Sequence, residues 1–144
     1  MLSNKKAYLT TSDQTYERMI DRQLQRMGCD VVRFQTEKHC LQNLTPDTDL
    51  IVLDFHPKGY VARVQMMHEI QSVNKSMAIL LLLNRRDLIK ISPLHHAGRI
   101  FYIEKGFNFQ EQFQAAIDQI CRDEKHAWTF LQTFRKRIFR IYGF

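Results

Sequence analysis

The sequence predicts an α/β domain in which five parallel strands form one sheet with helices on both of its faces. Short β-rich runs alternate with segments whose apolar residues recur at helical spacing, and this alternation is typical of a doubly wound parallel sheet. Two of the runs, residues 50–53 and 78–83, are apolar without interruption, as in strands buried on both faces. The alternation fills about 122 of the 144 residues, which suits a single domain.

The first expected elements are a strand, a helix and a second strand. Residues 7–10 are β-rich and run into a polar cluster, and residues 31–34 form a similar run. Between them, apolar residues recur every three or four positions, and Gly28 is placed to close a helix. The residues that carry this spacing are Tyr16, Met19, Ile20, Leu24 and Met27.

The middle of the chain predicts two more helices around the first apolar strand. Residues 40–44 suggest a short helix that the following Thr-Pro-Asp run stops. The strand at 50–53 ends abruptly at Asp54, and residues 56–59 form a loop. Apolar positions at helical spacing over residues 61–70 then indicate a third helix.

The last expected elements follow the second apolar strand. Residues 84–98 are ambiguous, because Pro93 interrupts any long helix. Residues 100–103 form a fifth strand, and Asn108 with Glu111 three positions later resembles a capping box that opens a final helix. The predicted domain therefore covers residues 1–122, followed by an amphipathic C-terminal helix at 123–144.

Polar side chains gather where several of these strands end. In parallel sheets, function concentrates at the carboxyl ends of the strands, near the point where the strand order reverses. The ends of the expected strands supply Thr11, Ser12, Asp13, Asp54, Leu83, Asn84 and Lys105. Asp54 is the candidate reactive group of this edge.

The run from Leu50 to Asp54, together with the run from Tyr102 to Lys105, resembles a bacterial response-regulator receiver (CheY-like) domain over roughly residues 5–122. The resemblance implies a flavodoxin-like (βα)5 fold. It also implies that Asp54 occupies the phosphoacceptor position, Lys105 the position of the lysine that contacts the phosphoryl group, and Tyr102 the aromatic switch position.

The chain departs from this pattern where the family binds its metal. The family places two acidic residues after the first strand to hold Mg²⁺, and those positions fall on Thr11 and Ser12. The switch Ser or Thr of the family falls on Leu83 or Asn84. Because phosphoryl transfer needs a divalent metal to neutralise charge, the chain resembles a degenerate receiver, or pseudo-receiver.

Three interpretations of Asp54 remain open. It can belong to a module that works without phosphorylation and without a cofactor. It can be a working phosphoacceptor, with Mg²⁺ held by Asp13, Asp54 and the backbone of His56. It can also be one half of a structural ion pair with Lys105.

Composition excludes several classes of protein. The three cysteines are widely spaced, which argues against a disulfide framework, and no apolar run is long enough to cross a membrane. The histidines lack metal-ligand spacing, and no phosphate loop, nucleophile elbow or catalytic triad is present. We therefore expect a cytoplasmic protein that is not an enzyme.

The C-terminal segment is basic and amphipathic. Residues 122–144 carry a surplus of four positive charges out of a formal net charge of +6. A heptad seam alternates steps of four and three from the fifth helix to the chain end, with Glu124 as its only charged member. Its apolar members are Phe113, Ile117, Ile120, Ala127, Leu131, Phe134, Ile138 and Ile141.

This seam has three interpretations. It can form a homodimer or a linker to an output domain, it can fold back onto the domain, or it can contact a membrane surface or nucleic acid. The leading expectation is a two-component signalling module that acts by protein–protein interaction and self-association. The alternatives are a phosphorylatable response regulator and the regulatory N-terminal part of a larger effector.

Overall fold

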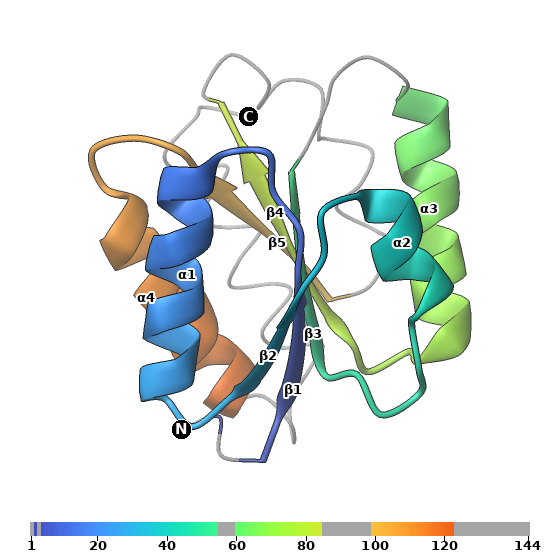
Figure 1. The fold of residues 1–144 in the computed structure, drawn as a ribbon, viewed down its shortest axis with the longest axis horizontal. Helices are drawn as coiled ribbons and strands as arrows, with labels where there is room; N and C mark the ends of the chain where they lie inside the picture. Colours follow the sequence, from blue (N-terminus) through green and yellow to red (C-terminus); the bar gives the residue numbers. More distant parts are fainter. Residues whose placement is uncertain (1, 3, 55–59, 85–98, 123–144) are drawn as a thin grey trace.

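The computed structural model describes residues 2, 4–54, 60–84 and 99–122, with the side chains of residues 60–64 excepted. Within these residues, five strands form one sheet in the order β2-β1-β3-β4-β5, and every neighbouring pair is parallel (Figure 1). The predicted doubly wound sheet is thus confirmed. The strands are β1 (Lys6–Leu9), β2 (Asp30–Arg33), β3 (Leu50–Asp54), β4 (Ala78–Leu83) and β5 (Ile100–Glu104).

Helices cover both faces of this sheet. Helices α1 and α4 lie on one face, and α2 and α3 lie on the other (Figure 1). Their bounds are α1 (Gln14–Arg26), α2 (Glu37–Gln42), α3 (Tyr60–Val73) and α4 (Phe109–Arg122). The ambiguous stretch around Pro93 and the predicted C-terminal helix at 123–144 lie outside the described residues.

The core divides into two clusters because side chains alternate between the faces of each strand. In β3, Leu50 and Val52 face the cluster under α1 and α4, whereas Ile51 and Leu53 face the cluster under α2 and α3. The same alternation holds along β4 and β5. A strand that serves two cores must be apolar at every position, which explains the uninterrupted runs in the sequence.

The turns around the sheet follow local chemistry. Asp13 is the N-cap of α1, and its carboxylate accepts hydrogen bonds from the backbone N–H groups of Thr15 and Tyr16. Gly28 has φ of 83° just after α1, a conformation that favours glycine and that allows the chain to turn into β2. The predicted end of this helix is confirmed.

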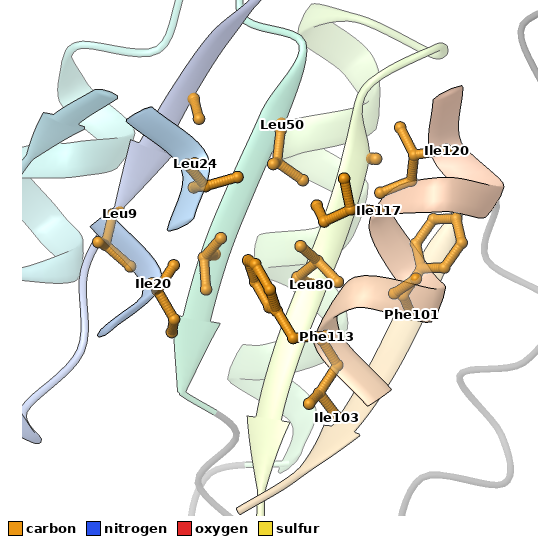
Figure 2. Packing of buried hydrophobic residues seen from close by; sticks show 14 of the residues in the cluster. Leu9, Ile20, Leu24, Leu50, Leu80, Phe101, Ile103, Phe113, Ile117 and Ile120 are labelled. Atoms are coloured by element: carbon orange, nitrogen blue, oxygen red, sulfur yellow. The ribbon is translucent and has the colours of Figure 1, made fainter. Parts of the chain in front are cut away.

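The structure corrects one part of the predicted dimer seam. Phe113, Ile117 and Ile120 project from α4 into the cluster beneath α1 and α4, with exposed fractions of 0%, 1% and 7% (Figure 2). They are therefore core residues of one chain, and it was wrong to assign them to an interface between two chains. The sequence did not separate the two roles, because a helix packing on a sheet and a helix packing on a second helix need the same spacing. The remaining seam residues, Ala127, Leu131, Phe134, Ile138 and Ile141, lie outside the described residues.

None of the described helices is long and apolar enough to cross a membrane.

Candidate functional site

The candidate site lies at the carboxyl edge of the sheet, between β1 and β3. The strand order reverses between these two strands, since β1 is flanked by β2 on one side and by β3 on the other. In sheets of this topology, the crevice at that point is where ligands bind. Thr11 and Ser12 follow β1, and Asp54 is the last residue of β3.

Asp54 is a buried carboxylate, 3% exposed, with donors on both of its oxygens. The Thr11 hydroxyl donates a hydrogen bond to Oδ1 at 2.8 Å. The backbone N–H of Ser12 donates to Oδ2 at 2.9 Å, and the Ser12 hydroxyl donates to the same oxygen at 3.1 Å. Thr11 and Ser12, at which the resemblance predicts the family's acidic pair, thus bind the aspartate directly.

Lys105 is a further donor to Asp54 among the residues that the structure describes. Its Nζ lies 3.2 Å from Asp54 Oδ1, and the two side chains are 19% and 5% exposed. The backbone fixes this approach, because the N–H of Lys105 donates to the carbonyl of Leu83 at 2.8 Å. The ion pair that the sequence predicted as one interpretation is therefore present.

The pKa of Asp54 reflects a balance between burial and these donors. Burial by itself raises the pKa of the carboxyl group. The hydrogen bonds from Ser12 and Thr11, together with the positive charge of Lys105, outweigh that effect and hold the pKa below its usual value. Asp54 is therefore a carboxylate at neutral pH.

Tyr16 is a member of this site that the sequence did not reveal. Lys105 Nζ lies 5.6 Å from the centre of the Tyr16 ring, within the range of a cation–π contact. The same ring packs edge-on against Phe109, with centroids 4.6 Å apart. At the sequence level, Tyr16 is one of several apolar residues at helical spacing, and nothing marks it as a neighbour of Lys105.

The donor set does not fit the Mg²⁺ site that the resemblance implies. Mg²⁺ needs carboxylate oxygens that are accessible to the ion, together with water and phosphate oxygens. In place of the two acids are hydroxyls that donate to Asp54. The Asp13 carboxylate caps α1, and Asp13 contributes to the pocket through its backbone N–H, which donates to the Thr11 hydroxyl oxygen at 3.2 Å.

Within the described ranges, no group of three or more His, Cys, Asp or Glu side chains is arranged to hold a metal ion. His56, the third member of the alternative Mg²⁺ set, lies outside those ranges.

The two residues at the end of β4 that the resemblance predicts at the switch position, Leu83 and Asn84, carry no hydroxyl group. Leu83 is 1% exposed and belongs to the core cluster under α2 and α3, and Asn84 is exposed. Tyr102 is 8% exposed and lies in the same cluster as Leu83. The structure thus places Tyr102 among core side chains, on the face of the sheet opposite to α4.

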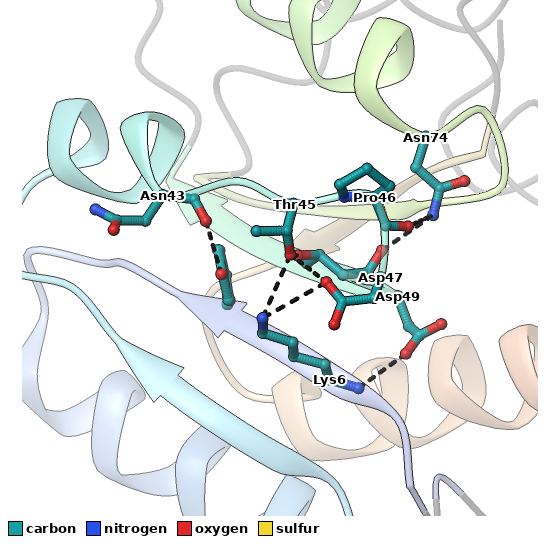
Figure 3. A network of polar contacts seen from close by, with 9 residues as sticks. Lys6, Asn43, Thr45, Pro46, Asp47, Asp49 and Asn74 are labelled. Carbon is teal, nitrogen blue, oxygen red and sulfur yellow. Dashed lines mark hydrogen bonds and ion pairs between the residues drawn. The ribbon is translucent and has the colours of Figure 1, made fainter.

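A second polar cluster lies at the opposite edge, around the amino ends of β1 and β3 (Figure 3). Lys6 Nζ lies 3.7 Å from Asp47 and 3.3 Å from the Thr45 hydroxyl, which also donates to Asp47. Asn74 donates to the carbonyls of Pro46 and Thr48. These contacts tie the connection between α2 and β3 to β1 and to the end of α3.

The fold has known relatives, although no family model and no curated protein matches the sequence. The response regulator DrrB from Thermotoga maritima is similar with a TM-score of 0.66 and 22% identity, over 84% of this chain and 54% of DrrB. A response regulator receiver protein from Burkholderia phymatum has a TM-score of 0.61 and 17% identity, over 82% of this chain and 96% of that protein.

Response regulator TrrA from Thermotoga maritima, solved in complex with Mg²⁺-BeF, gives a TM-score of 0.62 and 20% identity, over 81% of this chain and 98% of TrrA. This chain therefore spans about half of DrrB and nearly all of the other two proteins. The strand order, the helices on both faces and these likenesses agree with one another. The chain has the flavodoxin-like fold of response-regulator receiver domains.

Proposed function

We propose that this protein is a receiver-like signalling module that acts by protein–protein contact and does not depend on phosphorylation of Asp54. The fold likeness supports a role in signal transduction. One observation carries the rest: the two positions that would hold a metal instead donate three hydrogen bonds to Asp54. In such a module the pocket is a fixed structural element, and the outer surface contacts the partner.

The chemistry of the pocket explains this proposal. A carboxylate can accept a phosphoryl group only if the charge on the transferred group is neutralised as the bond forms. Thr11 and Ser12 carry no charge, and their donated hydrogen bonds lower the nucleophilicity of both Asp54 oxygens. Lys105 is then the only described cation that contacts the carboxylate.

The main alternative is a phosphorylatable response regulator, which the retained pair of Asp54 and Lys105 favours. The two functions differ in a direct experiment. The full chain is incubated with Mg²⁺ and a small acyl phosphate, and its intact mass is measured before and after hydroxylamine treatment. We expect no mass gain, whereas a hydroxylamine-sensitive gain that Asp54→Ala abolishes would establish the phosphoacceptor.

A gain-of-function variant sharpens this result. Thr11→Asp with Ser12→Asp restores two carboxylates where the family has them, and it removes two hydroxyl donors from Asp54. We expect this double variant to bind Mg²⁺ in a calorimetric titration, while the parent protein shows no saturable heat. Gln42→Glu with Gln110→Glu adds the same charge at exposed positions and is the matched control. If the control binds Mg²⁺ equally well, the effect is one of net charge, and our account of the pocket is wrong.

Self-association through the C-terminal segment remains part of the proposal in a narrower form. Because Phe113, Ile117 and Ile120 are core residues, only the seam residues beyond Arg122 are left to join two chains. We expect the full chain to be a dimer and a chain ending at Arg122 to be a monomer when their masses are measured in solution. If both are monomers, the seam does not dimerise, and strongly salt-dependent binding to DNA or anionic vesicles would favour the basic-helix alternative.

The wider context of the module follows from the same proposal. We place it in the cytoplasm, without enzymatic activity of its own. The fold also occurs in a structure described as an adenylate cyclase from Rhodopirellula baltica, with a TM-score of 0.60 and 14% identity. The role of a regulatory domain in a larger effector is therefore a further alternative. The mass of the protein as its own cells produce it would test this alternative.

A further inference from the structure

The outer surface of α1 carries a row of three arginines. Arg18, Arg22 and Arg26 follow one another at intervals of four residues, and all three are exposed. Residues four apart lie on the same side of a helix, and their Cα atoms are about 6 Å apart along its axis. We call Arg18, Arg22 and Arg26 the arginine row.

Charges on α1 are segregated by sign. Glu17 lies 3.3 Å from Arg33 of β2, and Asp21 lies 3.7 Å from the same arginine. Asp21 also accepts a hydrogen bond from Gln25. The acidic side chains of α1 thus point toward β2, and they leave the arginine row without an ion pair among the described residues.

This arrangement costs helix stability. Like charges four residues apart on a helix repel each other by about 0.2–0.5 kcal/mol per pair. Arg26 lies in the last turn, where a positive charge is favourable, but this does not apply to Arg18 and Arg22. No ion pair among the described residues offsets the repulsion at Arg18 and Arg22, and an external group that supplies negative charge would relieve it.

We propose that the arginine row binds an acidic helix of a partner protein, with Asp or Glu at every fourth position. A facing helix with this spacing repeats its carboxylates at the same interval of about 6 Å. Arginine suits this task because its planar guanidinium forms two parallel hydrogen bonds with one carboxylate. The inference rests on the proposed function as a protein-contact module, and it places one contact surface on α1.

A protein partner fits this surface better than nucleic acid does. Specific binding to a phosphate backbone draws on many phosphate contacts, whereas the row offers three cations. Glu17 and Asp21 lie on the adjacent side of the helix, and Asp13 lies at its N-terminus. These carboxylates would repel a polyanion that runs continuously past the helix. A short helix whose carboxylates face only the arginine row avoids that repulsion.

The experiment uses the full chain and a labelled alanine-based helical peptide with glutamates at positions 4, 8 and 12. A matched peptide carries glutamine at those positions. Binding is followed by fluorescence anisotropy at low and at physiological salt. The test variant is Arg18→Gln with Arg22→Gln and Arg26→Gln. The control variant is Lys38→Gln with Lys75→Gln and Arg122→Gln, which removes the same charge from exposed positions elsewhere.

We expect the glutamate peptide to bind more tightly than the glutamine peptide, and the test variant to lose roughly tenfold or more in affinity. The control variant should stay within about twofold of the parent, since it keeps the arginine row. Equal losses in the two variants would overturn the inference, as would an absence of preference for the glutamate peptide. Tighter binding of a DNA duplex that depends on the row would assign the surface to nucleic acid instead. None of these outcomes bears on phosphoryl labelling of Asp54, so the labelling experiment tests the proposed function independently of this inference.

Discussion

The two edges of the sheet each hold a lysine–aspartate pair, and the two pairs behave differently. At the carboxyl edge, Lys105 and Asp54 are 3.2 Å apart, with side chains 19% and 5% exposed. At the amino edge, Lys6 and Asp47 are 3.7 Å apart, with side chains 27% and 76% exposed. The residue types are the same, so the difference in burial decides what each pair contributes.

The reasons for the low pKa values also differ. The pKa of Asp47 is lowered first by a hydrogen bond from Thr45, in an exposed position where water competes with every partner. The pKa of Asp54 is lowered against the effect of burial, which requires several donors at once. The ionised form of a buried carboxylate thus depends on the donors and cations around it, whereas water stabilises the ionised form of an exposed carboxylate.

The largest effect is expected from removing the cation of the buried pair. Lys105→Met leaves Asp54 buried with, among the described residues, the hydroxyl and backbone donors of Thr11 and Ser12, and we expect a loss of about 2–3 kcal/mol in the free energy of unfolding. Urea denaturation at neutral pH measures it. The matched variant Lys6→Met removes the cation of the more exposed pair, and its loss in the free energy of unfolding should be much smaller. Similar losses in both variants would show that burial does not distinguish the two edges.

A smaller, pH-dependent effect is expected at Thr11. Thr11→Val removes one donor to Asp54 and should cost about 1–2 kcal/mol at neutral pH. Because the pKa of Asp54 is lower in the folded state than in the unfolded state, this carboxylate stabilises the protein above the unfolded pKa of about 4. That stabilisation is lost as the pH falls through the folded pKa. The difference between Thr11→Val and the parent should therefore shrink on acidification.

Urea denaturation at a series of pH values between neutral and strongly acidic tests this dependence. Thr36→Val is the control, since Thr36 caps α2 by accepting a hydrogen bond from the backbone of His39. The free energy of unfolding lost in Thr36→Val should be similar in size to that lost in Thr11→Val, and it should not change over the pH range in which Asp54 titrates. A difference for Thr11→Val that stays constant with pH would contradict the role of Thr11 as a donor to a carboxylate.

The smallest effect is expected at Asp47. Asp47→Asn removes an exposed charge and keeps an acceptor for Thr45. We expect the midpoint of urea denaturation to stay within experimental error of the parent, in low salt and in high salt. A clear loss that salt suppresses would show that the amino-edge cluster depends on the charge of Asp47.

Much of the fold could be read from the sequence because its signals are local. The uninterrupted strands, the helical spacing around Leu24 and the glycine after α1 each report a short-range requirement of the backbone or of burial. The positions of Asp54 and Lys105 were also predicted, since Asp54 ends β3 and Lys105 directly follows β5. Parallel strands with helical crossovers bring such ends to one edge, so the meeting of these two residues follows from the topology.

The order of the elements, the two-faced core and the residues at the carboxyl edge all follow from the amino-acid sequence. The contacts that those residues make follow from how the elements pack against one another. The tertiary structure turned the Thr11 and Ser12 hydroxyls toward Asp54, used Asp13 as a helix cap and placed Tyr16 beside Lys105. It also assigned Phe113 to the core of one chain. The physical reason is that spacing along the chain fixes which face of an element a residue occupies, whereas its partner depends on which other element packs against that face.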